Sequence, residues 1–159
     1  MCTLAAVAFA WATLFSSAPA RAELPVGIWL DHTQRGAIEL YPCGANVCGR
    51  VIWMKNPLKP SGEPFRDRRN PDASKQNRTI CGMDLIGGLQ PDGRGNLLEG
   101  WIYDPERGQE FSAQIKRESD TTLVVTGYLM MPAFGKSFRW TKAPADLERC
   151  APIVKAAEG

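Results

Sequence analysis

The sequence predicts an all-β fold: a small antiparallel up-and-down β-barrel of about eight strands with one long loop excursion. Its 15 glycines and 12 prolines divide the 159 residues into short runs of alternating apolar and polar residues, which is the pattern of half-buried strands. Gly27 and Trp29 form the Gly-x-Trp motif that opens many small β-barrels, and Phe138 and Trp140 mark the last run. Successive hairpins close readily into a barrel, because closure removes the unpaired strand edges.

Eight runs carry this alternation, and we expect each to form a strand: residues 25–30, 37–41, 47–55, 81–89, 97–103, 109–117, 121–129 and 134–141. The fourth is the weakest, because Gly87 and Gly88 interrupt it. The sixth is the clearest. In it Phe111, Ala113 and Ile115 alternate with polar residues, so one face lies in a core and the other in water.

Residues 56–79 differ from the rest of the chain. They contain four prolines and few apolar residues, and a loop of this length in a compact domain is usually functional or disordered. We expect this excursion to lie over one mouth of the barrel. Four of its charged residues, together with Asn70, fit an anion site, mutual salt bridges or a solvated surface. These residues are Arg66, Asp67, Arg68 and Arg78.

The first 22 residues are expected to be a cleaved signal peptide. Residues 4–15 are an apolar stretch too short to span a bilayer as a helix, and small residues allow cleavage after Ala20 or Ala22. No lysine or arginine precedes the stretch, which leaves an uncleaved anchor as the alternative. We therefore predict a barrel domain over 23–145, a C-terminal tail over 146–159, and a periplasmic or secreted product that does not span the membrane.

The cysteines fit an oxidising compartment. Cys2 lies in the expected signal peptide, and an even number remains: Cys43, Cys48, Cys81 and Cys150. The first two enclose a turn-like segment, which favours a disulfide across a hairpin, and a second bridge would tie the tail to the barrel. Four free thiols are the alternative. A zinc site lacks a second ligand pair at familiar spacing, so we predict neither metal nor cofactor.

The chain is not a strongly basic protein, because its basic and acidic side chains nearly balance. Removing the first 22 residues leaves 18 basic and 17 acidic side chains. This net charge gives no electrostatic reason to expect nucleic acid or an anionic membrane as a partner.

A string of motifs runs through most of the chain. It comprises the Gly-x-Trp at 27–29, Cys-Gly pairs at 43–44, 48–49 and 81–82, Asn-Pro-Asp at 70–72, Gly-Trp-Ile-Tyr-Asp-Pro at 100–105 and Gly-Tyr at 127–128. This order resembles the bacterial secreted family catalogued as domain of unknown function 2147, over residues 24–142. The resemblance implies a small exported protein with a lipocalin-like, or calycin-like, barrel and no established activity.

The resemblance also implies structural roles at the first strand. In lipocalin-like barrels a tryptophan there packs across the closed end beneath a basic side chain from the last strand. Gly27 and Trp29 would take this role, with Arg139 or Lys142 as the cation–π partner.

Candidate ligand-binding residues are rings on strands and polar groups at the barrel mouth: Trp53, Trp101, Tyr103, Tyr128, Arg78 and Asp104. Trp101 and Tyr103 share a face because they are two residues apart. If their rings point inward, they either line a cavity or fill the interior. Asp104, before Pro105, has the alternative role of capping a turn.

Catalysis has little support in the sequence. His32 is the only histidine, no nucleophile lies in a recognisable elbow, and no His/Glu cluster suggests a metal. We expect a non-enzymatic exported barrel that binds a small apolar or amphipathic ligand or a cell-envelope component. The alternatives are an envelope protein-interaction module with a packed interior and, third, an envelope hydrolase.

Overall fold

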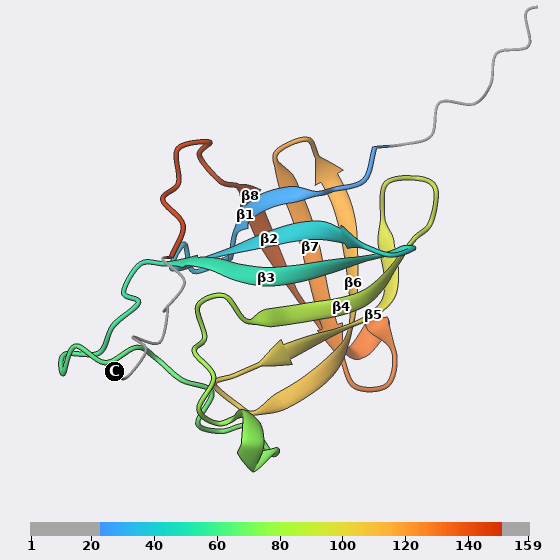
Figure 1. Ribbon diagram of the computed structural model, residues 1–159. Helices are drawn as coiled ribbons and strands as arrows, with labels where there is room; N and C mark the ends of the chain where they lie inside the picture. The colour runs from blue at the N-terminus through green and yellow to red at the C-terminus, as the bar shows by residue number, and fades with distance from the viewer. Residues whose placement is uncertain (1–22, 151–159) are drawn as a thin grey trace, which may run out of the picture.

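The structure is a computed structural model that describes residues 23–150. The signal peptide expected over 1–22 and the end of the expected tail lie outside the described residues. Eight antiparallel strands follow one another in chain order around a closed barrel (Figure 1). They are β1 (Gly27–Leu30), β2 (Gly36–Cys43), β3 (Asn46–Met54), β4 (Asp84–Pro91), β5 (Leu97–Asp104), β6 (Gln109–Ser119), β7 (Thr122–Tyr128) and β8 (Lys136–Lys142). The predicted all-β class and up-and-down barrel are confirmed.

The barrel closes where β1 pairs with β8, over Trp29 with Lys142 and Leu30 with Thr141. The other elements are two short 3₁₀ turns, η1 (Ala73–Lys75) and η2 (Pro132–Phe134). Within residues 23–150, no helix has the length and apolarity to cross a bilayer.

Apolar side chains fill the interior. The core cluster consists of Trp29, Ile38, Leu40, Val47, Val51, Ile86, Leu89, Leu97, Ile115, Leu123, Val125 and Trp140. Leu97, Ile115 and Leu123 have no exposed surface. Burial of such side chains is the main favourable contribution to folding.

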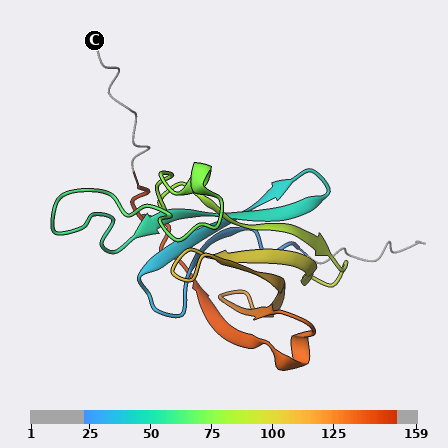
Figure 2. The ribbon, with the colours of Figure 1, turned by 90° about the horizontal axis from the view of Figure 1, so that it is seen from below.

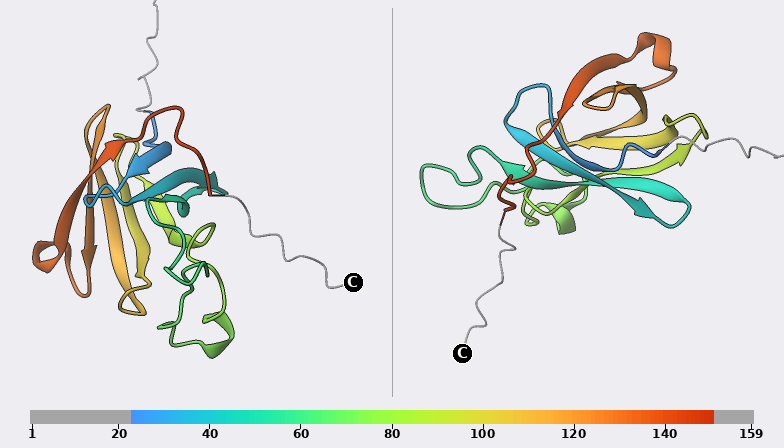
Figure 3. Two further views of the ribbon diagram at one scale, coloured as in Figure 1. Left: turned by 90° about the vertical axis from the view of Figure 1, so that its left-hand side faces the viewer. Right: turned by 90° about the horizontal axis from the view of Figure 1, so that it is seen from above.

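The two ends of the barrel differ. In the left view of Figure 3, the β5–β6 turn, the β7–β8 loop and the long excursion lie at the lower end, which we call the mouth. The chain enters at the opposite, closed end, beside the β6–β7 turn. Figure 2 views the barrel from the mouth side, where the β7–β8 loop and the excursion lie on opposite sides.

Trp29 closes the end opposite the mouth. Its indole Nε1 donates a hydrogen bond of 3.0 Å to the Pro25 carbonyl, and Lys142 Nζ lies 4.8 Å from the centre of its rings. Gly27 has φ +116°, and an added Cβ there would approach the Lys142 amine. Of the two cations expected for Trp29, Lys142 is therefore the partner. Arg139 forms an ion pair with Glu118 instead.

The excursion connects β3 to β4 and lies at the rim of the mouth. Two isolated bridges, Leu58 with Pro64 and Arg66 with Thr79, give it internal order. Its backbone packs so closely on the β5–β6 turn that a Cβ at Gly108 would collide with a carbonyl of the excursion. The excursion thus packs beside the mouth, where the sequence had suggested a position over it.

The described part of the tail crosses the outer face of the first strands. Ala143 N donates to the Ile28 carbonyl at 3.0 Å, and Cys150 N donates to the Ile52 carbonyl at 2.7 Å. The expected disulfide between Cys81 and Cys150 fixes the end of this segment. The described tail is therefore part of the barrel's covering.

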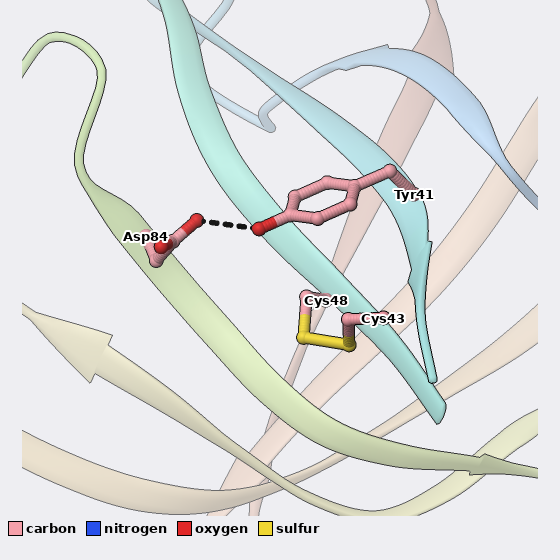
Figure 4. The surroundings of a disulfide bond; sticks show 4 residues. All are labelled: Tyr41, Cys43, Cys48 and Asp84. Atoms are coloured by element: carbon pink, nitrogen blue, oxygen red, sulfur yellow. Dashed lines mark hydrogen bonds between the residues drawn. A yellow bond between two sulfur atoms is a disulfide. The ribbon is translucent and has the colours of Figure 1, made fainter. Parts of the chain in front are cut away.

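The second expected disulfide, between Cys43 and Cys48, bridges the ends of the β2–β3 hairpin (Figure 4). Beside it the Tyr41 hydroxyl donates a hydrogen bond of 2.8 Å to Asp84 Oδ1. The Arg50 guanidinium lies over the same tyrosine ring, 4.6 Å from its centre. These contacts join the outer faces of three adjacent strands.

Candidate functional site

The register of β5 places Trp101 and Tyr103 on the outer wall. Residues directly opposite in antiparallel strands share a face. Ile102 lies opposite Phe111, on the face that continues to the buried Ile115. Successive residues alternate faces, so both rings point away from the interior. Neither alternative for inward-facing rings, a lined cavity or a filled interior, applies to them.

The other two ring candidates also lie outside. Tyr128 is opposite Ser112, in the same outer row as Trp101. Trp53 is opposite Ala37, next to the inward-facing pair of Ile38 with Trp29, and the alternation again points it outward. The structure therefore does not bring the four rings together into one interior site.

Trp53 lines a surface hollow of its own. The hollow has a volume of about 350 Å³ and lies between the end of β3 and the tail, where Arg149 and Cys150 form its other side. Arg149 is already paired with Glu39. The pKa of Glu39 falls to about 2, chiefly because Arg149 donates hydrogen bonds to it, with Arg50 adding to the effect against the cost of burial.

Two candidates do meet, at a buried carboxylate of the excursion. Asp67 has no exposed surface. The Tyr103 hydroxyl donates to its Oδ1 at 2.7 Å and the Asn70 amide donates to its Oδ2 at 2.7 Å. Arg78 donates to Oδ2 from Nε at 2.9 Å and forms an ion pair with it from Nη2 at 2.8 Å. We call these four residues the Asp67 cluster.

The contacts within the cluster determine the protonation states of Asp67 and Tyr103. Burial raises the pKa of Asp67, but the hydrogen bonds from Tyr103, Asn70 and Arg78 outweigh it and hold the pKa below its usual value. Burial, and then the bond to Asp67, raises the pKa of Tyr103 to about 12. At neutral pH an ionised carboxylate thus accepts from a neutral phenol and a guanidinium. Both of its oxygens accept hydrogen bonds, one of them from β5, so the cluster serves to dock the excursion on β5.

Two further arginines of the excursion bond within it, whereas Arg69 donates to the Glu106 carbonyl of the β5–β6 turn. Arg66 donates to the Asn77 carbonyl, and Arg68 donates to the Asn77 side-chain oxygen at 3.1 Å. Of the mutual salt bridges expected among these residues, the structure forms the one between Arg78 and Asp67, whereas Arg66 and Arg68 bond to the neutral Asn77. An anion site would need cations that converge on free space, whereas the Arg78 guanidinium is committed to Asp67.

Asp104 caps the β5–β6 turn. Its Oδ1 accepts from the backbone N–H of Glu106 at 2.9 Å and of Arg107 at 3.2 Å, and its Oδ2 pairs with the Arg107 side chain at 2.6 Å. This is the turn-capping alternative for that residue. Both oxygens of its carboxylate are bound within its own turn.

The inner wall is least covered at the mouth. Phe138 faces inward opposite the core residue Val125, yet 38% of its surface is exposed. The imidazole of His32, from the β1–β2 loop, stacks on it with ring centres 4.2 Å apart. Ile102 and Phe111 complete this apolar rim and are only partly buried.

The absence of a side chain at Gly127 leaves the apolar rim open. Gly127 faces inward, opposite Ala113, and a Cβ there would meet Ile102 and Phe111 at ordinary contact distances of 3.5 and 3.8 Å. The mouth residues Ile102, Phe138 and Gly127 were not among the sequence candidates. The alternation of the last strands was the available signal, because it places Phe111 and Phe138 on the core face.

Within the described range 23–150, no three His, Cys, Asp or Glu side chains gather as a metal site would require. His32 is exposed, and its contact is the Phe138 ring.

Comparison with known proteins places this fold. No curated protein matches the chain. One solved structure that matches the chain is that of a Helicobacter pylori protein, HP1028, which is described as belonging to the lipocalin family. The two share 21% identity with a TM-score of 0.65, over 77% of this chain and 84% of that one. The likeness shows a lipocalin-like fold. A family sequence profile, described as "Uncharacterized protein conserved in bacteria (DUF2147)", matches residues 27–142. This chain is therefore a member of the DUF2147 family.

Proposed function

We propose that this protein is an exported, non-enzymatic binder of a small amphipathic molecule, whose apolar part lies in the barrel mouth. The observation that carries the proposal is the uneven covering of the inner wall. Toward the closed end, Leu97 and Ile115 have no exposed surface, whereas Phe138 at the mouth keeps 38% of its surface exposed. Its lipocalin-like architecture supports small-ligand binding, since such barrels take ligands at their open ends.

The packed interior sets the size of the ligand's buried part. The core side chains occupy the axis of the barrel, so the molecule enters only as far as the level of Ile102 and Phe111. A ring or a short length of alkyl chain fits such a rim. The net positive charge of the mouth connections favours an anionic group at the outer end of the ligand.

Export is the setting for this function. The two disulfides need an oxidising compartment, which supports a periplasmic or secreted location. The ligand is then a molecule of the cell envelope or its surroundings.

The test places a larger side chain in the mouth and leaves the closed end unchanged. We expect a fluorescent long-chain fatty acid to bind wild-type protein saturably, and Gly127→Leu to weaken binding by at least about tenfold because the new side chain occupies the rim. Gly127→Ala is the matched control, since a single methyl group fits at ordinary contact distance. Native mass spectrometry of protein purified from its own host would identify the natural ligand.

The second candidate is an interaction module with a packed interior. The outward orientation of Trp53, Trp101 and Tyr128 favours it. If wild-type protein binds no lipophilic probe, or if Gly127→Leu binds as well as Gly127→Ala, the mouth is not a ligand site and the module is the better description.

A further inference from the structure

The β7–β8 loop exposes the longest apolar segment of the described surface. Residues 129–134 read Leu-Met-Met-Pro-Ala-Phe. The exposed fractions are 66% for Leu129, 88% for Met130, 48% for Met131 and 82% for Phe134. Consecutive exposed apolar residues are unfavourable in water and are uncommon on soluble proteins unless they contact a partner.

The geometry of the loop keeps these side chains outward. The η2 turn lies within it, and Gly135 follows, packed so closely on Tyr128 and Thr126 that a Cβ there would crowd both. This contact fixes the base of the loop against β7. The loop therefore lies beyond the ends of β7 and β8 on the mouth side (Figure 3), and its apolar side chains are exposed.

Charge is distributed unevenly between the two ends. The four connections at the mouth, residues 31–35, 55–83, 105–108 and 129–135, hold nine basic and five acidic side chains. At the closed end, residues 23–26, 44–45, 92–96 and 120–121 hold one basic and three acidic side chains. The mouth connections therefore carry a net positive charge, whereas the closed-end connections carry a small net negative charge beside the strand residues Arg117 and Lys142.

We propose that the mouth end docks on an anionic lipid surface, with residues 129–134 inserted among the acyl chains and the basic residues of the rim facing the headgroups. Apolar insertion and attraction to anionic headgroups are the two contributions that hold proteins at a membrane interface. A second copy of the chain fits this surface less well, because a symmetric contact would bring two positive ends together.

Vesicle sedimentation tests the proposal with protein purified from its own host. We expect it to pellet with vesicles of phosphatidylglycerol and phosphatidylcholine, and to pellet less in high salt or with phosphatidylcholine alone. Met130→Ser with Phe134→Ser should reduce the bound fraction at least about tenfold. Leu58→Ser is the control, since Leu58 is another exposed apolar residue (51%) and lies in the excursion.

A tryptophan reporter locates the inserted segment. The emission of Met130→Trp should shift to shorter wavelength on the anionic vesicles and be quenched by brominated acyl chains, whereas Arg94→Trp, at the closed end, should do neither. Absence of pelleting, equal pelleting of the double variant, or equal quenching of both reporters would overturn the proposal. So would a wild-type dimer, seen by sedimentation velocity, that the double variant abolishes, because the occupant is then a second copy.

Docking is independent of the ligand site in the barrel. Gly127→Leu should leave vesicle binding unchanged, so failure of either proposal is recognisable without the other.

Discussion

The Tyr103 hydroxyl donates a hydrogen bond of 2.7 Å to Asp67 Oδ1, joining the outer wall of β5 to the excursion 36 residues earlier in the chain. Asn70, the first residue of the Asn-Pro-Asp motif, donates to the same carboxylate. Asp104, next to Tyr103, caps the turn on which the excursion rests. Two of the motifs that characterise the chain therefore act together as a docking device at the rim of the mouth.

Replacing Tyr103 with phenylalanine tests this device. We expect Tyr103→Phe to lower the free energy of unfolding by about 1–2 kcal/mol, because a buried carboxylate loses one of its donors. Amide exchange in residues 64–80 should accelerate more than exchange in the β6–β7 hairpin. Urea denaturation and exchange mass spectrometry measure the two effects. Tyr128→Phe, on the outer row of β7, is the control, and equal effects of the two variants would argue against the docking role.

Acid should weaken the protein through its paired carboxylates. The pKa of Glu39 is lowered from 4.5 to about 2, first by hydrogen bonds from Arg149 and also by Arg50. A lowered folded-state pKa gives stability that is present above the unfolded value and lost as pH falls through the folded one. Stability from Glu39 should therefore disappear between about pH 4.5 and about pH 2. Asp67, whose pKa is also lowered, acts in the same direction.

Glu39→Gln isolates the first of these contributions. The variant should unfold at lower temperature than wild type at neutral pH, and the difference should shrink below about pH 4.5, because wild type loses the ion pair there too. The loss at neutral pH should be about 1 kcal/mol, since half of each arginine is exposed and water screens the pair. Glu110→Gln, on an exposed part of β6, controls for a general charge effect. A difference that stays constant down to pH 2 would contradict the assignment.

The strands could be predicted because alternation and turn residues act locally. Alternation alone could not predict on which face of β5 the rings of Trp101 and Tyr103 lie. Counting by two from the buried Leu97 would send Trp101 and Tyr103 inward. Glu99, at φ +58°, sits in an irregularity between Leu97 and Gly100 that shifts the register. One extra residue reverses every later side chain in a strand, so a bulge without a sequence signal turned both rings outward.

At the closed end, the alternation of residues along β8 identifies the cation that packs on Trp29. The buried Trp140 faces inward, and Lys142, two residues later, shares its face. Arg139 must therefore face outward, where it meets Glu118. The choice between the two cations was thus contained in the alternation of β8. The Asp67 cluster could not be predicted in this way, because its residues come from the excursion and from β5, and no local sequence pattern specifies that these two segments lie together.

Gly108 should be the most sensitive glycine of the mouth. It has φ +64°, and an added Cβ would collide with the Arg69 carbonyl. Gly93 has φ +77° with no heavy atom within 4 Å of an added Cβ, so it carries the backbone strain without the collision. We expect Gly93→Ala to cost about 1 kcal/mol and Gly108→Ala to cost clearly more, about 3 kcal/mol, because the excursion must move away. Urea denaturation compares them, and equal costs would show that the excursion does not rest on this turn.

The two disulfides should contribute unequally to stability. Cys81 and Cys150 are 69 residues apart, and Cys43 and Cys48 are 5 apart. In the chain-entropy description, the longer loop restricts the unfolded chain more, by about 4 kcal/mol against about 2 kcal/mol. Serine replacement of each pair, followed by urea denaturation, should reproduce this order.

Only the long bridge also holds a covering segment in place. The strand next to the tail contains Ile52, which is 6% exposed and whose carbonyl accepts the hydrogen bond from Cys150 N. Loss of the Cys81–Cys150 bridge should therefore accelerate amide exchange along the start of β2 and the end of β3, while loss of the hairpin bridge should act only near the β2–β3 turn. If the hairpin pair proves the more costly, or if exchange beneath the tail is unchanged, the hydrogen bonds and the Arg149–Glu39 ion pair hold the tail without the disulfide.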